Sequence, residues 1–199
     1  MNNSKKNIIL IHGLWNTPNI FNGLIKSLKD FDIKIFTPHL PHSFGRTNLY
    51  NLAIDLDVYI NSNLGPNTPI DLLGFSMGGL IARIWLQKMN GSFRTKRFIS
   101  LGSPNNGTIV AQLVPFALFP GIAQMKRNSS LIRDLNNDFS ALDNVNCISY
   151  FCPWDLMVIP GWEAVLPVGS KFSLPVLYHK ELIKSPLAIK SLVKSIIYD

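Results

Sequence analysis

The stretch of sequence that decides the fold is Ile70-Asp71-Leu72-Leu73-Gly74-Phe75-Ser76-Met77-Gly78-Gly79-Leu80-Ile81. Its first four residues predict a buried strand, and the apolar spacing from Leu80 to Trp85 predicts a helix that follows directly. The connection between them is Gly74-x-Ser76-x-Gly78. A serine between a strand and a helix, with glycine two residues away on each side, is typical of a nucleophile elbow.

The elbow explains both glycines and the serine. The turn is so tight that a Cβ atom two residues from the serine has no room, and glycine has none. Gly79 in addition lets the helix pack closely on the sheet. The alternative is a glycine-rich turn in which the serine has no catalytic role. The expected strand directly before the motif and the expected helix directly after it favour the elbow. Ser76 is therefore the candidate nucleophile.

Outward from this segment, short apolar runs alternate with longer segments of helical periodicity. Further strands are expected at residues 8–11, 33–36, 98–101, 145–151 and 173–178, and further helices at 18–28, 49–60 and 186–197. This alternation predicts an α/β fold, with helices on both faces of a mostly parallel sheet. The chain of 199 residues fits a single domain over residues 1–199, with no large cap domain.

Residues 104–144 form the least regular segment. They hold an apolar patch at residues 113–119 and a short helical pattern around Leu131 and Leu135. Irregular segments of this length are commonly functional. Two interpretations remain open here: a small lid or lipid-contacting surface, and apolar residues that pack on the core.

A serine hydroxyl needs a base within hydrogen-bond reach, and the base needs an acid that orients it. Elbow enzymes place these groups in the chain order serine, acid, histidine. His179 is the one histidine after Ser76, and it follows the last expected strand. Asp155 follows the strand 145–151 after a short turn, which places it at the carboxyl edge of the sheet. These positions make His179 the candidate base and Asp155 the candidate acid.

Other carboxylates in the permitted interval are less well placed: Asp134, Asp138, Asp143 and Glu163. Asp71 precedes the serine in mid-strand, and we interpret it as structural.

The oxyanion of an acyl-transfer intermediate needs two backbone donors. The residue after the nucleophile supplies one, here the N–H of Met77, and a loop after an early strand supplies the other. Leu14 is the candidate for that second donor, with Trp15 as the alternative. His12 is expected to shape this loop. His39 and His42 are expected in a loop near the mouth of the site.

Composition restricts the partners. The net charge is +7, but the basic residues are scattered and accompany no nucleic-acid motif. Cys147 and Cys152 are five residues apart, so in one strand they point to opposite faces, which is poor geometry for a disulfide. We therefore expect two buried thiols, no metal and no cofactor. No apolar run reaches the ~20 residues of a spanning helix, and no export signal is evident, so we expect a cytoplasmic protein.

Four segments together resemble the small bacterial lipases and esterases of the α/β-hydrolase fold: His12-Gly13-Leu14-Trp15, Gly74 to Gly79, Leu101-Gly102-Ser103-Pro104-Asn105-Asn106-Gly107-Thr108, and Trp154 to Pro160. Residues 124–136 also resemble that group, and the resemblance covers nearly the whole chain. It implies Ser76 as nucleophile, Asp155 as acid in an Asp-x-x-Val setting, His179 as base, and Leu14 and Met77 as oxyanion donors. Family members often have glycine where Trp154 and Tyr178 stand here, and these larger residues would narrow the site.

The expected activity is hydrolysis of carboxylic esters through an acyl-enzyme. Expected partners are a small-molecule or lipid ester and, transiently, a membrane surface, with no obligate protein partner. A thioesterase or acyltransferase would use the same residues, and a non-catalytic binding protein is the third possibility. Candidate residues for an apolar pocket are Trp15, Leu113, Phe116, Leu156 and Met157.

Overall fold

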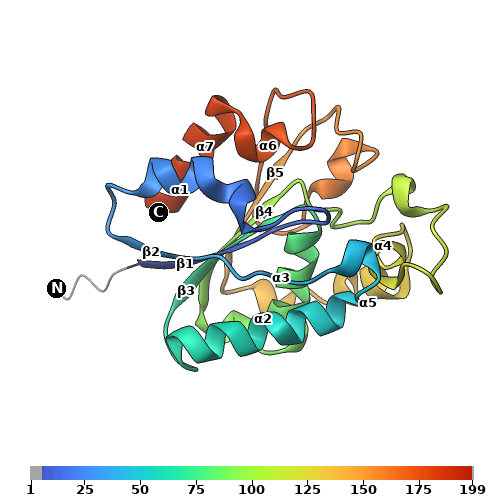
Figure 1. Ribbon diagram of the computed structural model, residues 1–199, viewed down its shortest axis with the longest axis horizontal. Coiled ribbons are helices and arrows are strands. Elements are labelled where there is room, and N and C mark those ends of the chain that lie inside the picture. Colours follow the sequence, from blue (N-terminus) through green and yellow to red (C-terminus); the bar gives the residue numbers. More distant parts are fainter. Residues whose placement is uncertain (1–5, 199) are drawn as a thin grey trace.

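The computed structural model describes residues 6–198, so residues 1–5 and 199 of the expected domain lie outside the described part. Six parallel strands form one sheet in the order β2-β1-β3-β4-β5-β6 (Figure 1). Their bounds are β1 Lys6–Ile11, β2 Ile33–Phe36, β3 Ile70–Phe75, β4 Thr95–Leu101, β5 Asn146–Phe151 and β6 Ser170–Ser173.

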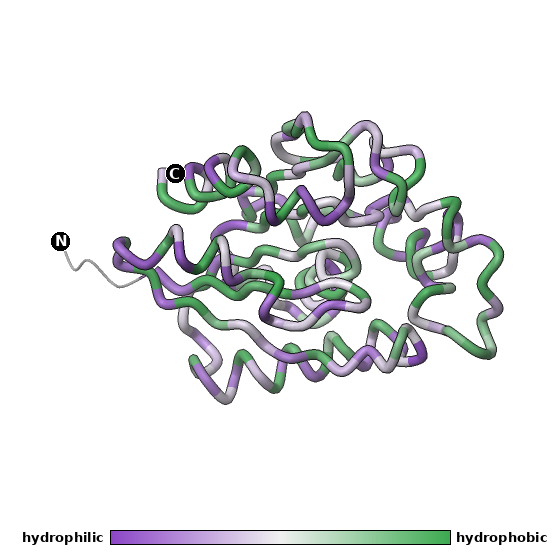
Figure 2. Tube along the Cα trace, turned by 45° about the horizontal axis from the view of Figure 1, so that its top comes forward, coloured by the Kyte–Doolittle hydropathy of each residue, from purple (hydrophilic) through white to green (hydrophobic). Residues whose placement is uncertain are grey.

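Helices cover both faces of the sheet (Figure 1). The helices α1 Asn22–Leu28, α6 Glu181–Lys184 and α7 Pro186–Ile197 lie on one face, against Ile8, Leu10, Leu73 and Phe75. The helices α2 Leu49–Leu64, α3 Met77–Lys88 and α5 Ser130–Asn136 lie on the other, against Ile9, Ile11 and Leu72. Alternate residues of a strand point to opposite faces. Central strands of such a sheet are therefore apolar over most of their length, with Asp71 in β3 and Lys96 and Arg97 in β4 as exceptions. Green segments accordingly run through the middle of Figure 2.

The strand register makes the carboxyl ends level. Ile11 pairs with Gly74, Phe75 with Leu101, and Leu101 with Tyr150. The chain leaves β1 for β2 on one side and then crosses to β3 on the other, so the strand order reverses between β1 and β3. Crevices at such a switch point, outside the carboxyl ends of the strands, are where open α/β sheets bind ligands. The loop after β1 and the turn after β3 meet at this crevice.

The α/β fold predicted from the sequence is confirmed, but the sixth strand is not where the sequence predicted it. We expected residues 173–178, whereas β6 is Ser170–Ser173. Every residue of β6 is exposed, and its single apolar residue, Phe172, is too little to predict a strand. Leu174 and Val176 carry that signal instead, because they pack beneath the last helices, and Pro175 between them has no N–H for a strand ladder.

Residues 104–144 divide into a packed part and an exposed part. They contain the short helix α4 Pro120–Ala123 as well as α5. Leu131 and Leu135 belong to the core beside α2 and α3, so packing explains the helical pattern. Leu113 is 95% exposed and belongs to an outer loop, which projects to the right in Figure 2. No helix among residues 6–198 is long and apolar enough to cross a membrane.

Cys147 and Cys152 are buried free thiols. Cys147 packs with the core that contains α2 and α3, and Cys152 with the core that contains α1 and α7. The expected placement on opposite faces is confirmed.

Candidate active site

Ser76 stands on a sharp turn between β3 and α3. Its backbone has φ 56° and ψ −127°, a strained conformation for a residue with a Cβ atom, and its N–H donates to the Leu101 carbonyl at 2.8 Å. A Cβ atom on Gly74 would lie 2.4 Å from the Gly79 Cα atom, and one on Gly78 would lie 2.2 Å from the Ile11 carbonyl oxygen. The turn therefore needs glycine at both positions, as the sequence motif indicated.

His179 lies beyond β6, in the loop that leads into α6. Its Nδ1 atom is 2.6 Å from Oδ2 of Asp155. The ring stacks on Phe75 at 5.0 Å between centroids, and Gly102 backs it, since a Cβ there would lie 3.2 Å from the His179 Cε1 atom. Its Nε2 atom is buried and has no hydrogen-bond partner among residues 6–198. The imidazole is thus fixed in orientation, with one nitrogen free for a reacting group.

Asp155 uses both carboxylate oxygens. Oδ2 meets His179, while Oδ1 accepts the N–H groups of Met157 at 2.8 Å and Val158 at 3.1 Å. The side chain is buried. Two backbone donors on one oxygen fix the carboxylate plane, so the other oxygen is aimed at the imidazole.

The other carboxylates serve elsewhere. Asp134 binds Lys88 at 2.8 Å and Tyr50, and Asp138 accepts the Ser140 N–H. Glu163 pairs with Arg127 at 2.8 Å.

Asp71 is buried in β3, 3.3 Å from Lys6 and 3.8 Å from Arg97. Burial raises its pKa, and the two cations partly offset that effect. The structural interpretation of Asp71 agrees with this position.

Ser76 and His179 line one cavity of about 690 Å³. This volume suits a small organic ligand. Apart from these two residues, Asn16, Thr108 and Lys180, the lining is mainly apolar: Leu14, Trp15, Phe44, Pro104, Val110, Ala111, Leu113, Val114, Pro115, Phe119, Ile122, Met125, Met157 and Val158. Trp15, Leu113 and Met157 had been proposed from the sequence.

Two other pocket candidates lie outside this lining, which corrects the expectation. Phe116 and Leu156 are 59% and 65% exposed. Phe116 belongs to the outer loop of residues 104–144. Leu156 lies in the turn where Asp155 accepts the two N–H groups that follow it, and its side chain is turned to solvent.

The loop after β1 approaches Ser76 closely. A Cβ atom on Gly13 would lie 2.8 Å from the Ser76 Cβ atom, so this backbone can come near only as glycine. The loop is held as a turn, because Asn16 donates its N–H to the Gly13 carbonyl and its amide to the Leu14 carbonyl at 2.7 Å. Within the described residues, the N–H groups of Leu14 and Met77 have no protein acceptor. Two free donors thus flank the serine.

Comparison with known proteins bears on this arrangement. A family model described as alpha/beta hydrolase fold matches residues 6–142. The chain belongs to the alpha/beta hydrolase fold family. No curated protein matches the sequence.

Solved structures share the fold at low sequence identity. Aspergillus fumigatus lipase B is 21% identical with a TM-score of 0.81, over all of this chain and 54% of that one, so this chain spans about half of that enzyme. The mature lipase of Bacillus licheniformis is 15% identical with a TM-score of 0.73, over 98% of this chain and 93% of that one. Bromoperoxidase from Bacillus anthracis is 12% identical with the same TM-score and coverage. At these identities the likenesses show the fold alone.

Thr108 is a site residue that our reasoning from the sequence did not single out. Its hydroxyl donates to the Met157 carbonyl at 3.0 Å and accepts the Ile159 N–H at 3.1 Å. It thereby ties the start of residues 104–144 to the loop that carries Asp155. The segment 101–108 was noticed for its resemblance to this family, but one sequence gives no reason why that position should be threonine.

Arg83 of this alpha/beta hydrolase is a second such residue. Its guanidinium is fully buried two turns after Ser76 and donates to the carbonyls of Asn105 and Leu135 and to the side chain of Asn136. Burial lowers its pKa to about 9. An arginine on an apolar helix face is the sequence signal that could have found it. Its role is to anchor residues 105–136 to α3.

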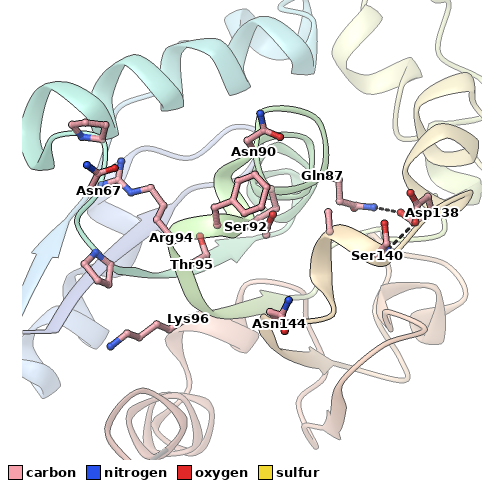
Figure 3. A pocket seen from close by; sticks show the side chains of 15 residues that line it. Asn67, Gln87, Asn90, Ser92, Arg94, Thr95, Lys96, Asp138, Ser140 and Asn144 are labelled. Atoms are coloured by element: carbon pink, nitrogen blue, oxygen red, sulfur yellow. Dashed lines mark hydrogen bonds between the residues drawn. The ribbon is translucent and has the colours of Figure 1, made fainter.

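A second cavity, of about 790 Å³, lies at the opposite edge of the sheet, where β3 and β4 begin (Figure 3). Its lining is rich in amides and hydroxyls, among them Asn67, Asn90, Ser92 and Asn144, and includes no histidine or cysteine. Ser92 therefore has no imidazole beside it in this cavity. The grouping of serine, histidine and buried carboxylate occurs at the carboxyl edge.

Proposed function

We propose that this alpha/beta hydrolase cleaves carboxylic esters by acyl transfer through Ser76. One observation carries the proposal: His179, held by Asp155 at 2.6 Å, lines the same apolar cavity as Ser76. Nucleophile, base and orienting acid in this relation define the Ser-His-Asp mechanism, whichever fold carries it.

In the first half of the reaction, the Ser76 oxygen attacks the ester carbonyl while His179 Nε2 takes its proton. The tetrahedral intermediate collapses, and His179 returns the proton to the leaving alcohol. Water then attacks the acyl-enzyme by the same route, releasing the acid and free Ser76. Asp155 keeps the Nδ1–H tautomer in place and stabilises the imidazolium. His179 carries the proton in each step of both halves of the reaction.

The N–H groups of Leu14 and Met77 would stabilise the oxyanion. Both are free of protein acceptors in the described residues, and both belong to segments that flank Ser76. A donor of this kind contributes roughly 3 kcal/mol to transition-state stabilisation.

The apolar lining of the cavity favours the acyl chain of a lipid-like ester. Hydrolysis of thioesters, or transfer of the acyl group to another acceptor, would use the same groups. The solved structures that share the fold include enzymes named as lipases. Their low identity makes them support for this substrate class and no more.

We also propose transient contact with a lipid surface. Among the four tryptophans, Trp15, Trp154 and Trp162 are 57–73% exposed and follow β1 and β5 at the catalytic edge, whereas Trp85 is buried. Exposed aromatic side chains near the mouth of an apolar cavity fit the boundary between water and lipid. Lys180, which lines the cavity, would favour anionic headgroups.

Vesicles test the surface. With the Ser76→Ala protein, anionic vesicles should shift tryptophan fluorescence to shorter wavelength, and Trp162→Ser should weaken co-sedimentation. Phe93→Ser is the matched control, because Phe93 is 89% exposed beside the opposite cavity. Equal weakening by the control, or no shift at all, would count against the contact.

The catalytic proposal is tested with a fluorophosphonate probe and a series of p-nitrophenyl esters of increasing acyl length. Wild type should be labelled and hydrolyse the esters, and Ser76→Ala should do neither. Parallel thioester and alcohol-acceptor assays separate the alternatives. Folded wild-type protein that takes no label would refute the proposal and favour a binding protein.

A further inference from the structure

All four histidines of the chain lie at the catalytic edge, and three of them form a cluster beside the loop after β1. His12 follows β1 directly, and its ring stacks on His39 at 5.7 Å between centroids, with 27° between the planes. His42 meets His12 edge-on at 5.9 Å and 70°. The reaction outlined above uses His179 and none of these three.

The hydrogen bonds of His12 fix its protonation state. The Leu40 N–H donates to His12 Nε2 at 3.1 Å, so this nitrogen is an acceptor. The proton of the neutral ring therefore sits on Nδ1, which faces the Gly13 carbonyl at 3.1 Å. His12 is fully buried. A second proton would place an N–H on Nε2 directly opposite the Leu40 N–H, and this bond would be lost.

The histidine cluster connects the loop after β1 with the segment that follows β2. His12 joins residues 12–13 to Leu40, in the segment after β2. His42, in that same segment, meets the His12 ring edge-on, and its Nδ1 atom is buried without a hydrogen-bond partner among the described residues. Asn16 in turn holds the carbonyls of Gly13 and Leu14. Leu14 therefore belongs to a turn that His12 holds through the Gly13 carbonyl and that Asn16 holds through the carbonyls of Gly13 and Leu14.

The charges that act on the His12 and His42 rings come from other histidines of the same cluster. Desolvation lowers the pKa of His12 and of His42, and His39 lowers both further by charge repulsion, as His42 does for His12. The groups that act in the opposite direction are backbone atoms of Gly13 and Asn16. A proton gained by one ring makes the next one less favourable.

We propose that His12, His39 and His42 are positioning residues for the oxyanion hole: as neutral imidazoles they hold the turn that carries the Leu14 N–H, and a proton on His12 releases that turn. The inference rests on the proposed function, in which Leu14 is an oxyanion donor. It assigns to these three residues an effect on the chemical step, and it predicts that acid stops the enzyme by a second route besides protonation of His179.

The dependence of kcat/KM on pH is the first test. Protonation of His179 alone lowers kcat/KM about tenfold per pH unit, and a second essential proton makes the loss about a hundredfold per unit. Wild type should show the steeper limb while circular dichroism still reports folded protein. A limb of about tenfold per unit throughout would overturn the proposal.

Variants of His12 separate positioning from simple packing. Gln offers an oxygen to the Leu40 N–H and does not titrate, so His12→Gln should keep the plateau kcat within about threefold and reduce the acid limb to about tenfold per unit. His12→Ala removes the acceptor and should lower kcat about tenfold or more, with KM changed much less. His39→Gln removes a repelling charge and should move the steep limb to higher pH. A His12→Gln profile as steep as that of wild type would refute the inference.

Amide NMR on the full-length Ser76→Ala protein tests the coupling without catalysis. The Leu40 and Leu14 N–H signals should move with the same pH midpoint as the His12 ring signals, and in His12→Gln they should not move at that midpoint. A Leu14 N–H signal that does not shift at the pH midpoint of the His12 ring would overturn the proposal. Absence of ester hydrolysis by wild type, with this coupling intact, would overturn the ester-hydrolase function and not the control of the turn.

Discussion

Asp155→Asn should lower kcat about 10⁴-fold while leaving the protein folded. The carboxylate has two unlike neighbours: Oδ1 accepts two backbone N–H groups, and Oδ2 faces His179 Nδ1 at 2.6 Å. An asparagine here has one oxygen and one NH₂ group. Placing NH₂ against the two N–H groups would oppose three donors, so the oxygen takes the Oδ1 position and the NH₂ faces His179.

That orientation imposes the wrong tautomer on His179. Facing a donor, Nδ1 must become the acceptor, so the proton moves to Nε2, which can then no longer accept the proton of Ser76. The same substitution removes the charge that stabilises the imidazolium of the transition state. The predicted defect therefore arises from hydrogen-bond direction and charge, with almost no change in volume.

The magnitude follows from these two losses. A unit charge about 4 Å from the imidazolium, at an effective dielectric constant of about 20, contributes roughly 4 kcal/mol. Losing the charge-assisted hydrogen bond adds about 1.5 kcal/mol. Together these raise the barrier by about 5.5 kcal/mol, which corresponds to a factor of about 10⁴.

The assay is kcat on a short-chain p-nitrophenyl ester, with urea unfolding as the control for stability. Asp155→Ala is the matched variant. It leaves the N–H groups of Met157 and Val158 unpaired, so it should lose about 2 kcal/mol of unfolding free energy. It should nevertheless be no slower than Asp155→Asn, since it imposes no tautomer. If Asp155→Asn kept more than a tenth of wild-type kcat, the tautomer argument would be refuted.

Other predictions concern the frame around the site. Gly78→Ala sets a Cβ 2.2 Å from a β1 carbonyl oxygen and should cost about 3 kcal/mol in urea unfolding, against about 1 kcal/mol for Gly65→Ala, where the Cβ meets open space but φ is +70°. Arg83→Met leaves the Asn105 carbonyl and the Asn136 side-chain oxygen without their guanidinium donor, while the Leu135 carbonyl keeps Gln87, and it should cost about 3 kcal/mol; an effect below 1 kcal/mol would show that water replaces the guanidinium. Burial and the Asp134 hydrogen bond raise the Tyr50 pKa to about 12. The raised pKa means that the neutral Tyr50 phenol contributes stability fully below pH 10, and this contribution is lost between pH 10 and 12. Spectrophotometric titration of the Asp134→Asn protein should show a lower midpoint for Tyr50.

The sequence predicted those parts of the fold whose signals are local and buried. β3 is apolar except for Asp71 and is followed by a glycine-flanked serine, so strand, turn and helix follow from adjacent residues. β6 was missed because it is an exposed edge strand whose residues need no hydrophobic side chains. The run after it looked like a strand because Leu174 and Val176 are buried by helices from elsewhere in the chain. Their burial is a tertiary effect that no local window contains.

The candidate site divides in the same way. Chain order and strand ends were enough to nominate Ser76, Asp155 and His179, since the carboxyl ends of parallel strands share an edge. What holds His179 could not be predicted: the ring lies against Phe75 and Gly102, which are 104 and 77 positions away in the sequence. Exposure does not separate the pocket candidates, because Trp15 and Leu113 line the cavity although they are 57% and 95% exposed, whereas Phe116, at 59%, does not line it. Which side of its loop a residue occupies decides the outcome, and one sequence does not show that.

Backbone strain follows a pattern that opposes local sequence preference. Among residues 6–198, six residues other than glycine have positive φ, and two of these are asparagines in turns, which tolerate it. The other four are Trp15, Ser43, Phe44 and Ser76, and three of them line the cavity. Tryptophan and phenylalanine do not adopt this conformation by their own preference, and both side chains are largely exposed, so the hydrogen-bonded turns that contain them must impose it. Strain concentrated at one cavity indicates that the sequence trades local stability there for the placement of a nucleophile and the loops around it.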